Sequence, residues 1–212
     1  MEQEEIMFGV VKYVALLLSL CVHEAAHAVA ADRCGDPSAR LLGRVTLNPV
    51  KHIDPIGTVL MPLLMFFTSI PFLIGWAKPV PVNHLNLRNI RRDPVLIALA
   101  GPGSNILLAI LTIIAARACG YAGLLEQSAP LVLFLIVMLF TNVSLAIFNC
   151  IPVPPLDGHY VLHYFLPPAG QQMLEQIGPF GILIAMFVSR PLFEQLGPVF
   201  GVLTKLAFGV NI

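Results

Sequence analysis

The chain has 212 residues, of which 57% are hydrophobic and 11% are charged, and its mean hydropathy is +0.83. A soluble domain carries about 25% charged residues, so the composition excludes an ordinary soluble globule and predicts an all-α protein that crosses the lipid bilayer several times. Acidic and basic residues are equal in number, twelve of each. This balance leaves no basic field for nucleic acid, which is not expected as a partner.

Four apolar stretches have about the 20 residues that a helix needs to cross the hydrocarbon. They comprise residues 6–31, 56–76, 94–118 and 130–150. A weaker fifth region, 178–210, is broken by Arg190-Pro191 and Gly197-Pro198, so one kinked helix, two short helices and a re-entrant element are all open for it. We predict four to six hydrophobic segments in one membrane-embedded domain over 1–212, with its core at about 7–165.

The first segment contains the strongest chemical signal, His23-Glu24-Ala25-Ala26-His27. Because histidines four residues apart share one face of a helix, both imidazoles can bind one metal ion, and Glu24 can reach a metal-bound water. The alternative is a set of polar groups that are satisfied within a helical bundle. Ionisable residues are costly inside a membrane and are functional by default, so the pattern favours a metal site.

The second segment, 56–76, is predicted to be re-entrant. Lysines and arginines favour the cytoplasmic side, and the loops before and after this segment carry four each: Arg33, Arg40, Arg44 and Lys51, then Lys78, Arg88, Arg91 and Arg92. A full crossing would place one of these equally basic loops outside, whereas a segment that dips in and returns keeps both inside. Pro62, Pro71 and Gly75 suit such a broken hairpin. Residue 151 onward then begins at the cytoplasmic side.

The third segment follows Asp93-Pro94, which is typical of an N-cap and the first residue of a helix. Inside it lies Gly101-Pro102-Gly103-Ser104-Asn105. Small residues allow helices to approach closely, and the amide of Asn105 needs a partner. Helix packing and the shaping of a site are both open interpretations of this stretch.

The fourth segment ends in Asn149-Cys150-Ile151-Pro152-Val153-Pro154-Pro155-Leu156-Asp157-Gly158. Three prolines in four positions exclude a helix and favour an extended path, which is tolerated at membrane depth only when it is buried in protein or lines water. We predict that this Pro-rich stretch delivers the carboxylate of Asp157 to the active site, and the alternative is a simple turn at Asp-Gly. Asn149 either binds a developing oxyanion or caps the end of the helix.

A catalytic zinc site takes three protein ligands and keeps a position for water, so the two histidines need a third ligand. The candidates are His52, Asp54, His84, Asp93, Asp157, His159 and His163. Asp157 is favoured because the re-entrant topology brings it to the same side as His23 and His27. Those two residues lie about 6 to 12 Å below the cytoplasmic surface, at roughly 1.5 Å per helical residue.

The remaining candidates receive other predictions. His159 and His163 form a second pair four residues apart, and both stay open as the third ligand or as contacts of the ligands. His52 and His84 lie in basic loops and are predicted to be solvated, and Asp54 precedes a proline at a predicted helix start.

The sequences HEAAH in a membrane helix and NCIPVPPLDG after a later one, with AGPGSN between them, resemble the site-2 protease family of intramembrane zinc metalloproteases, in its small bacterial form without a PDZ domain. The resemblance covers about residues 7–165. It implies one Zn²⁺ per chain held by His23, His27 and Asp157, with Glu24 as general base and Asn149 beside the scissile carbonyl. Many relatives have a second Gly after Asp-Gly, where this chain has a histidine.

The expected function is hydrolysis of peptide bonds within or near transmembrane segments of substrate proteins, known as regulated intramembrane proteolysis. The expected partners are a transmembrane protein substrate and the lipid bilayer, and the expected location is the cell membrane, with the active site toward the cytoplasmic side. The alternative is a metal transporter or scaffold that binds an ion without hydrolysis. Transport needs polar groups on both sides of the membrane midplane, whereas here they gather toward one side.

Overall fold

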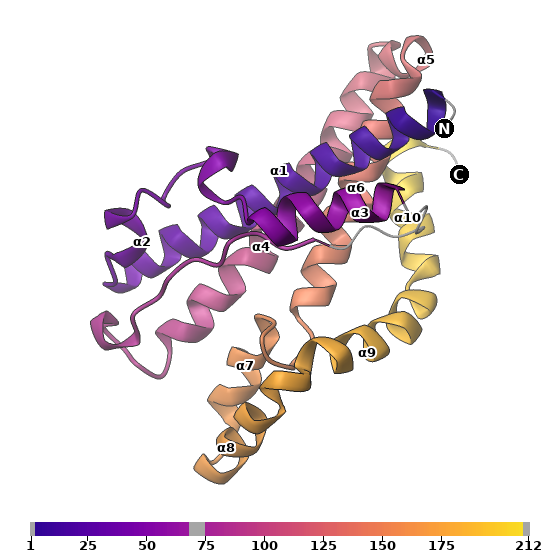
Figure 1. Ribbon diagram of the computed structural model, residues 1–212. Coiled ribbons are helices and arrows are strands. Elements are labelled where there is room, and N and C mark those ends of the chain that lie inside the picture. Colours follow the sequence, from indigo (N-terminus) through magenta and orange to yellow (C-terminus); the bar gives the residue numbers. More distant parts are fainter. Residues whose placement is uncertain (1–2, 68–74, 210–212) are drawn as a thin grey trace.

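The computed structural model describes residues 3–67 and 75–209, and this part of the chain contains helices and no β-strand. Three long helices, α1 (Gln3–Cys34), α4 (Asp93–Tyr121) and α6 (Ala129–Asn149), pack against one another as the body of the molecule (Figure 1). Short helices in the connections are α2 (Ser38–Leu41), η1 (Pro49–Lys51), η2 (Pro55–Leu60), α3 (Met61–Phe67), η3 (His84–Asn86) and α5 (Leu124–Gln127). The C-terminal helices are α7 (Gly158–Phe165), α8 (Pro168–Ile177), η4 (Gly178–Phe180), α9 (Gly181–Gln195) and α10 (Gly197–Phe208).

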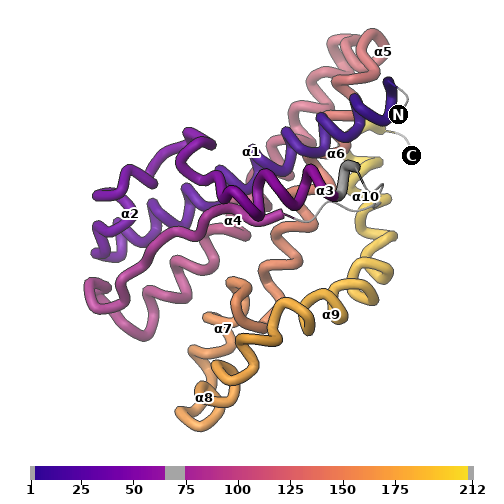
Figure 2. Tube along the Cα trace, in the orientation of Figure 1, coloured from indigo at the N-terminus to yellow at the C-terminus, as the bar shows by residue number. Residues whose placement is uncertain are grey.

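Four helical runs are long and apolar enough to cross a membrane: α1, α4, α6 and the run 168–195. The spans predicted at 6–31, 94–118 and 130–150 are therefore confirmed. Within the described part of the weaker fifth region, 178–209, the helices α9 and α10 are separated at Leu196, because α10 begins at Gly197 with Pro198 in its first turn, whereas Pro191 lies within α9 without ending it. Helices α8 to α10 form a curved arm that leaves the body at α7 and returns to it where α10 contacts α4 (Figure 2).

The starts of α6 and α4 differ in how they are capped. The side chain of Ser128 accepts a hydrogen bond from the backbone N–H of Leu131 and so caps α6. The prediction for Asp93 is wrong by one position, because Asp93 is the first residue of α4 and the N-cap position belongs to Arg92. Asp93 is fully buried and accepts a hydrogen bond from the backbone N–H of Asn89, 2.8 Å away.

The predicted re-entrant segment begins as η2 and α3 and has ends that meet. Asp54 caps η2 by accepting hydrogen bonds from the backbone N–H groups of the first turn, which confirms its predicted helix start. The backbone N–H of Trp76 donates to the carbonyl of Gly57 at 3.2 Å, and the Thr58 hydroxyl donates to the carbonyl of Trp76 at 2.8 Å. A full crossing would separate these positions by the thickness of the membrane. Residues 68–74 of the segment lie outside the described residues.

The Pro-rich stretch does not follow the predicted extended path. Residues 151–157 form consecutive bends and turns, in which the N–H of Val153 donates to Ile151 and the N–H of Leu156 donates to Val153, both through backbone carbonyls. Three prolines exclude a helix but fit tight turns equally well, since proline presets the φ that turns need. The chain folds back so closely at Gly158 that a Cβ there would collide with the backbone of Cys150.

Candidate metal centre

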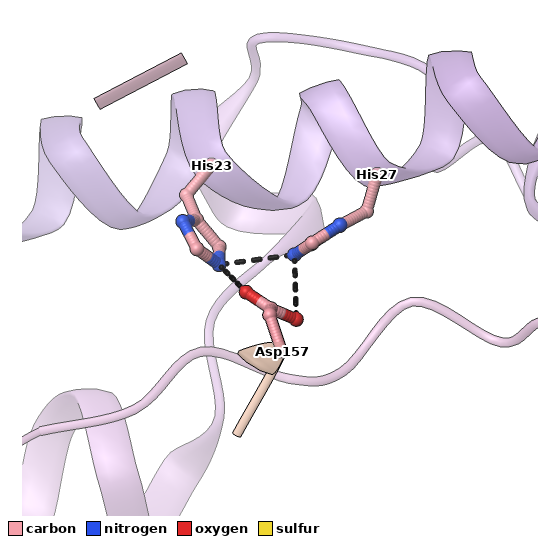
Figure 3. Close-up of side chains that lie close together, drawn as sticks. All are labelled: His23, His27 and Asp157. Atoms are coloured by element: carbon pink, nitrogen blue, oxygen red, sulfur yellow. Dashed lines mark hydrogen bonds and ion pairs between the residues drawn. The ribbon is translucent and has the colours of Figure 1, made fainter. Parts of the chain in front are cut away.

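Two histidines from α1 and one aspartate from the turn before α7 converge on a single point (Figure 3). The Nε2 atoms of His23 and His27 are 3.0 Å apart, and they lie 3.2 and 3.4 Å from the carboxylate oxygens of Asp157. His23 is 5% exposed, His27 is 8% exposed, and the side chain of Asp157 is 17% exposed. The group thus offers two imidazole nitrogens and one carboxylate in a shielded place, which are ligands that catalytic zinc takes.

The hydrogen bonds around this group leave atoms that face its centre free for a metal. His27 Nδ1 lies 2.7 Å from the backbone carbonyl of Ile97. A carbonyl can only accept, so Nδ1 donates and Nε2 of the neutral ring keeps its lone pair. The Oδ2 atom of Asp157 is buried and has no hydrogen-bond partner. A cation satisfies both the lone pair and the buried carboxylate oxygen, so the residues present fit a zinc ion.

Gly101 of α4 lies directly against the two histidines. A Cβ at this position would lie 2.6 Å from the His23 ring and would collide with Nε2 of His27. No side chain larger than hydrogen therefore fits between α4 and the metal centre. Helix packing and the shaping of a site were both open interpretations of residues 101–105. Gly101 serves both, because it lets α4 pack closely against α1 and leaves room for the two imidazoles.

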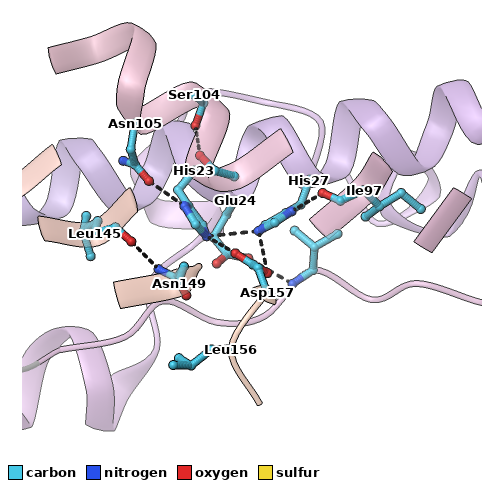
Figure 4. Close-up of polar contacts among 12 residues, drawn as sticks. His23, Glu24, His27, Ile97, Ser104, Asn105, Leu145, Asn149, Leu156 and Asp157 are labelled. Atoms are coloured by element: carbon cyan, nitrogen blue, oxygen red, sulfur yellow. Dashed lines mark hydrogen bonds and ion pairs between the residues drawn. The ribbon is translucent and has the colours of Figure 1, made fainter. Parts of the chain in front are cut away.

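Glu24 is held by a segment that the sequence did not point to. Its Oε2 atom accepts a hydrogen bond from the backbone N–H of Val80 at 3.1 Å (Figure 4). The guanidinium of Arg44, which is only 5% exposed, donates to the carbonyls of Lys78 and Pro79 and so anchors this segment. In the sequence, the charge of Arg44 indicated only that its loop lies on the cytoplasmic side. Its contact with Lys78 and Pro79 could not be predicted, because these residues are over 30 positions away.

The prediction that His52 is solvated is wrong. His52 is 1% exposed, and its Nε2 donates to the carbonyl of Thr46 at 2.8 Å. Its own carbonyl accepts from the N–H of Lys78 at 2.9 Å, so His52 supports the same segment that Arg44 anchors. Residues of a loop that folds onto the protein in this way cannot be separated from solvated ones by composition alone.

Asn149 lines the same cavity as Asp157. Its Nδ2 atom donates to the carbonyl of Leu145, 3.0 Å away in its own helix (Figure 4). An amide nitrogen carries two hydrogens, so one N–H remains for a ligand in the cavity. The oxyanion role of Asn149 stays a prediction.

The other histidine candidates lie outside the group. His84 is exposed, and its ring lies 6.1 Å from that of Tyr160. His159 Nδ1 is 2.6 Å from the carbonyl of Leu156, and burial lowers the pKa of this imidazole. His163 Nε2 lies 3.8 Å from a carboxylate oxygen of Glu175. Among the described residues, the structure therefore brings together only His23, His27 and Asp157 as a group of possible metal ligands.

The chain is similar to bacterial proteins over most of its length. It is 36% identical over 174 residues to "Putative zinc metalloprotease YwhC" of Bacillus subtilis, which covers 81% of this chain and 76% of that protein. It is 30% and 32% identical to proteins named "Putative zinc metalloprotease Rip2" of Mycolicibacterium smegmatis and Mycobacterium tuberculosis, and it spans 62% and 66% of their lengths. No family model and no solved structure matches the chain.

The names of these relatives agree with the donor set that the fold assembles. Two imidazoles from a helix that is long and apolar enough to cross a membrane meet the carboxylate of Asp157, and the relatives are named as zinc metalloproteases. The chain belongs to the site-2 protease family.

Proposed function

We propose that the protein is an intramembrane zinc metalloprotease that hydrolyses peptide bonds within or near transmembrane segments of other proteins, with one Zn²⁺ per chain. The observation that carries the proposal is that His23 and His27, on a helix apolar enough to span a membrane, converge with Asp157. Glu24 lies on the same helix beside them. Bound zinc in such a site acts as a Lewis acid that polarises a peptide carbonyl and activates water.

Glu24 is the general base and later the general acid of the proposed reaction. The N–H of Val80 binds one carboxylate oxygen, Oε2, which fixes the rotamer and leaves Oε1 to accept a proton from the attacking water. The same oxygen then donates that proton to the nitrogen of the leaving amine. Asn149 lines the cavity, and in the proposed reaction its second N–H donates to the carbonyl oxygen as negative charge develops.

The proposed substrate is a transmembrane helix that reaches the site from the bilayer. Its carbonyls are engaged in helical hydrogen bonds, so it must unwind locally before hydrolysis. The cavity at the site joins Asp157 and Asn149 to apolar residues, among them Leu99, Val161 and Leu162, and such a lining suits an unwound apolar segment. The basic loops that flank this end of α1 support a location on the cytoplasmic side of the cell membrane.

A metal transporter or scaffold would use the same three ligands without hydrolysis. The relatives are named as proteases, and a held general base beside the ligands has no role in transport. These observations favour the protease.

The proposal is tested on purified wild type, Glu24→Gln and Glu126→Gln in detergent. Glu126 is an exposed residue of α5 and serves as the control. Bound zinc is measured by elemental analysis, and cleavage is measured on a panel of single-span proteins. We expect about one zinc in all three proteins and cleavage by wild type and Glu126→Gln only, since general-base loss costs at least about 100-fold. Loss of zinc in Glu24→Gln would overturn its role as base, and zinc without cleavage in wild type would favour the transporter.

A further inference from the structure

A chain of buried polar side chains links three helices and ends on the metal centre. Ser19 of α1, Asn105 of α4 and Asn142 of α6 are each 0% exposed. Asn105 Oδ1 lies 2.6 Å from His23 Nδ1, Asn105 Nδ2 donates to Asn142 Oδ1 at 2.9 Å, and Asn142 Nδ2 donates to the Ser19 hydroxyl at 2.9 Å. The Ser19 hydroxyl donates in turn to the carbonyl of Ala15 at 2.7 Å.

Backbone carbonyls fix the direction of every hydrogen bond that links Ser19, Asn142, Asn105 and His23. Asn142 Nδ2 lies 2.9 Å from the carbonyl of Met138, which can only accept, so the amide of Asn142 must place its nitrogen there and its oxygen toward Asn105. Asn105 must then present Nδ2 to that oxygen, which leaves its own Oδ1 toward His23. An amide oxygen only accepts, and therefore His23 Nδ1 must carry a hydrogen.

We propose that Asn105 and Asn142 are positioning residues that fix the His23 tautomer, so that the lone pair of Nε2 faces the metal position. Asp157 makes this control necessary. Its carboxylate oxygen lies 3.2 Å from His23 Nε2 and would accept a hydrogen from that nitrogen if Nδ1 had no acceptor. Nε2 would then donate its hydrogen to Asp157, and the lone pair of the ring would lie on Nδ1, away from the metal position. This inference rests on the metal site of the proposed function.

His27 provides an internal control for the inference. Its Nδ1 donates to the backbone carbonyl of Ile97 at 2.7 Å, an acceptor that no side-chain substitution removes. The two histidines thus share one site but have different anchors. A substitution at Asn105 that acts through the tautomer changes His23 and spares His27, whereas general disruption of the bundle changes both.

The first measurement is ¹⁵N NMR of histidine-labelled, metal-free protein in detergent at about pH 9, where an ordinary imidazole is neutral. In wild type we expect the hydrogen on Nδ1 in both His23 and His27. In Asn105→Leu we expect the His23 hydrogen on Nε2, toward Asp157, with His27 unchanged. A wild-type His23 with its hydrogen on Nε2 would overturn the proposal, and so would a variant in which His23 is unchanged or both rings change alike.

The second measurement is zinc affinity by chelator competition. Asn105→Leu is expected to bind zinc about 10- to 100-fold more weakly than wild type, the usual cost of removing a partner of a metal ligand. Asn105→Asp keeps an acceptor for His23 in either protonation state and is expected to recover most of the affinity. Thr112→Val removes another buried polar group of α4, whose hydroxyl binds only the carbonyl of Leu108 among the described contacts, and is expected to have no effect.

These readouts separate the inference from the proposed function. Equal zinc affinity in wild type and Asn105→Leu would overturn the positioning role while leaving the protease proposal intact. A wild type that binds no zinc would overturn the proposed function, and the NMR measurement on metal-free protein would still decide the tautomer of His23.

Discussion

At the scale of single residues, the candidate metal centre depends on the absence of a side chain at Gly101 as much as on its histidines. Gly101 leaves room for the imidazoles of His23 and His27, and a Cβ there would collide with one of them. A helix can approach a metal site this closely only through a glycine. The ligands were visible in the sequence because their spacing is that of a helix face, but the need for glycine depends on how two helices cross.

Substituting Gly101 by alanine is therefore expected to disturb the metal centre. The added methyl group should push His23 and His27 off their positions, lower the free energy of unfolding by about 1–3 kcal/mol and weaken zinc binding. Gly103→Ala is the matched control in the same helix, because a Cβ there meets nothing within 4 Å. Zinc competition and thermal unfolding of both variants check this prediction, and equal effects at the two positions would contradict it.

At the scale of elements, the segment from Trp76 to Val80 acts as a support for Glu24. Arg44 and His52 hold the segment through its backbone at Lys78 and Pro79, and the N–H of Val80 at its end donates to the carboxylate of Glu24, the proposed general base. Prolines and charges in the sequence indicated a loop but not its partner. Such contacts join residues far apart in the chain and exist only after the helices have packed.

Arg44→Met is expected to slow cleavage about 10- to 100-fold, because loss of hydrogen bonds from a charged group costs about 1.5–3 kcal/mol and frees Val80 from its position at Glu24. Zinc content should stay at the wild-type level, since the described hydrogen bonds of Arg44 go to Lys78 and Pro79 and not to the three candidate ligands. Arg40→Met is the control, because the Arg40 side chain is 64% exposed and pairs with Asp32. Cleavage rates and bound zinc are measured for both, and a loss of zinc in Arg44→Met would contradict this separation of roles.

At the scale of the whole molecule, the sequence predicted the helices and the grouping of His23, His27 and Asp157 better than the path of the chain between them. Apolar length predicted α1, α4 and α6, and the parity of crossings predicted that Asp157 would reach His23 and His27. The extended path of residues 152–155 was wrong because proline excludes helix without choosing between strand and turn. Asn105 was recognised in the sequence as an amide that needs a partner, but its partners, among them Asn142, depend on three-helix packing.

The topology makes a last prediction about which loops share a side of the membrane. Because the ends of the segment 56–76 meet at Gly57 and Trp76, the loops before and after it must lie on one side. Single cysteines replace Val50, Ile90 and Tyr121, which are exposed, in a protein whose four native cysteines are changed to serine.

A membrane-impermeant maleimide applied to sealed vesicles of either orientation then reports the side of each position. We expect labelling at positions 50 and 90 from the cytoplasmic face and at position 121 from the opposite face, since α4 crosses between Ile90 and Tyr121. Labelling of positions 50 and 90 from opposite faces would mean that residues 56–76 cross the membrane. That crossing would place Asp157 on the far side from His23 and His27, where the three could not form one site.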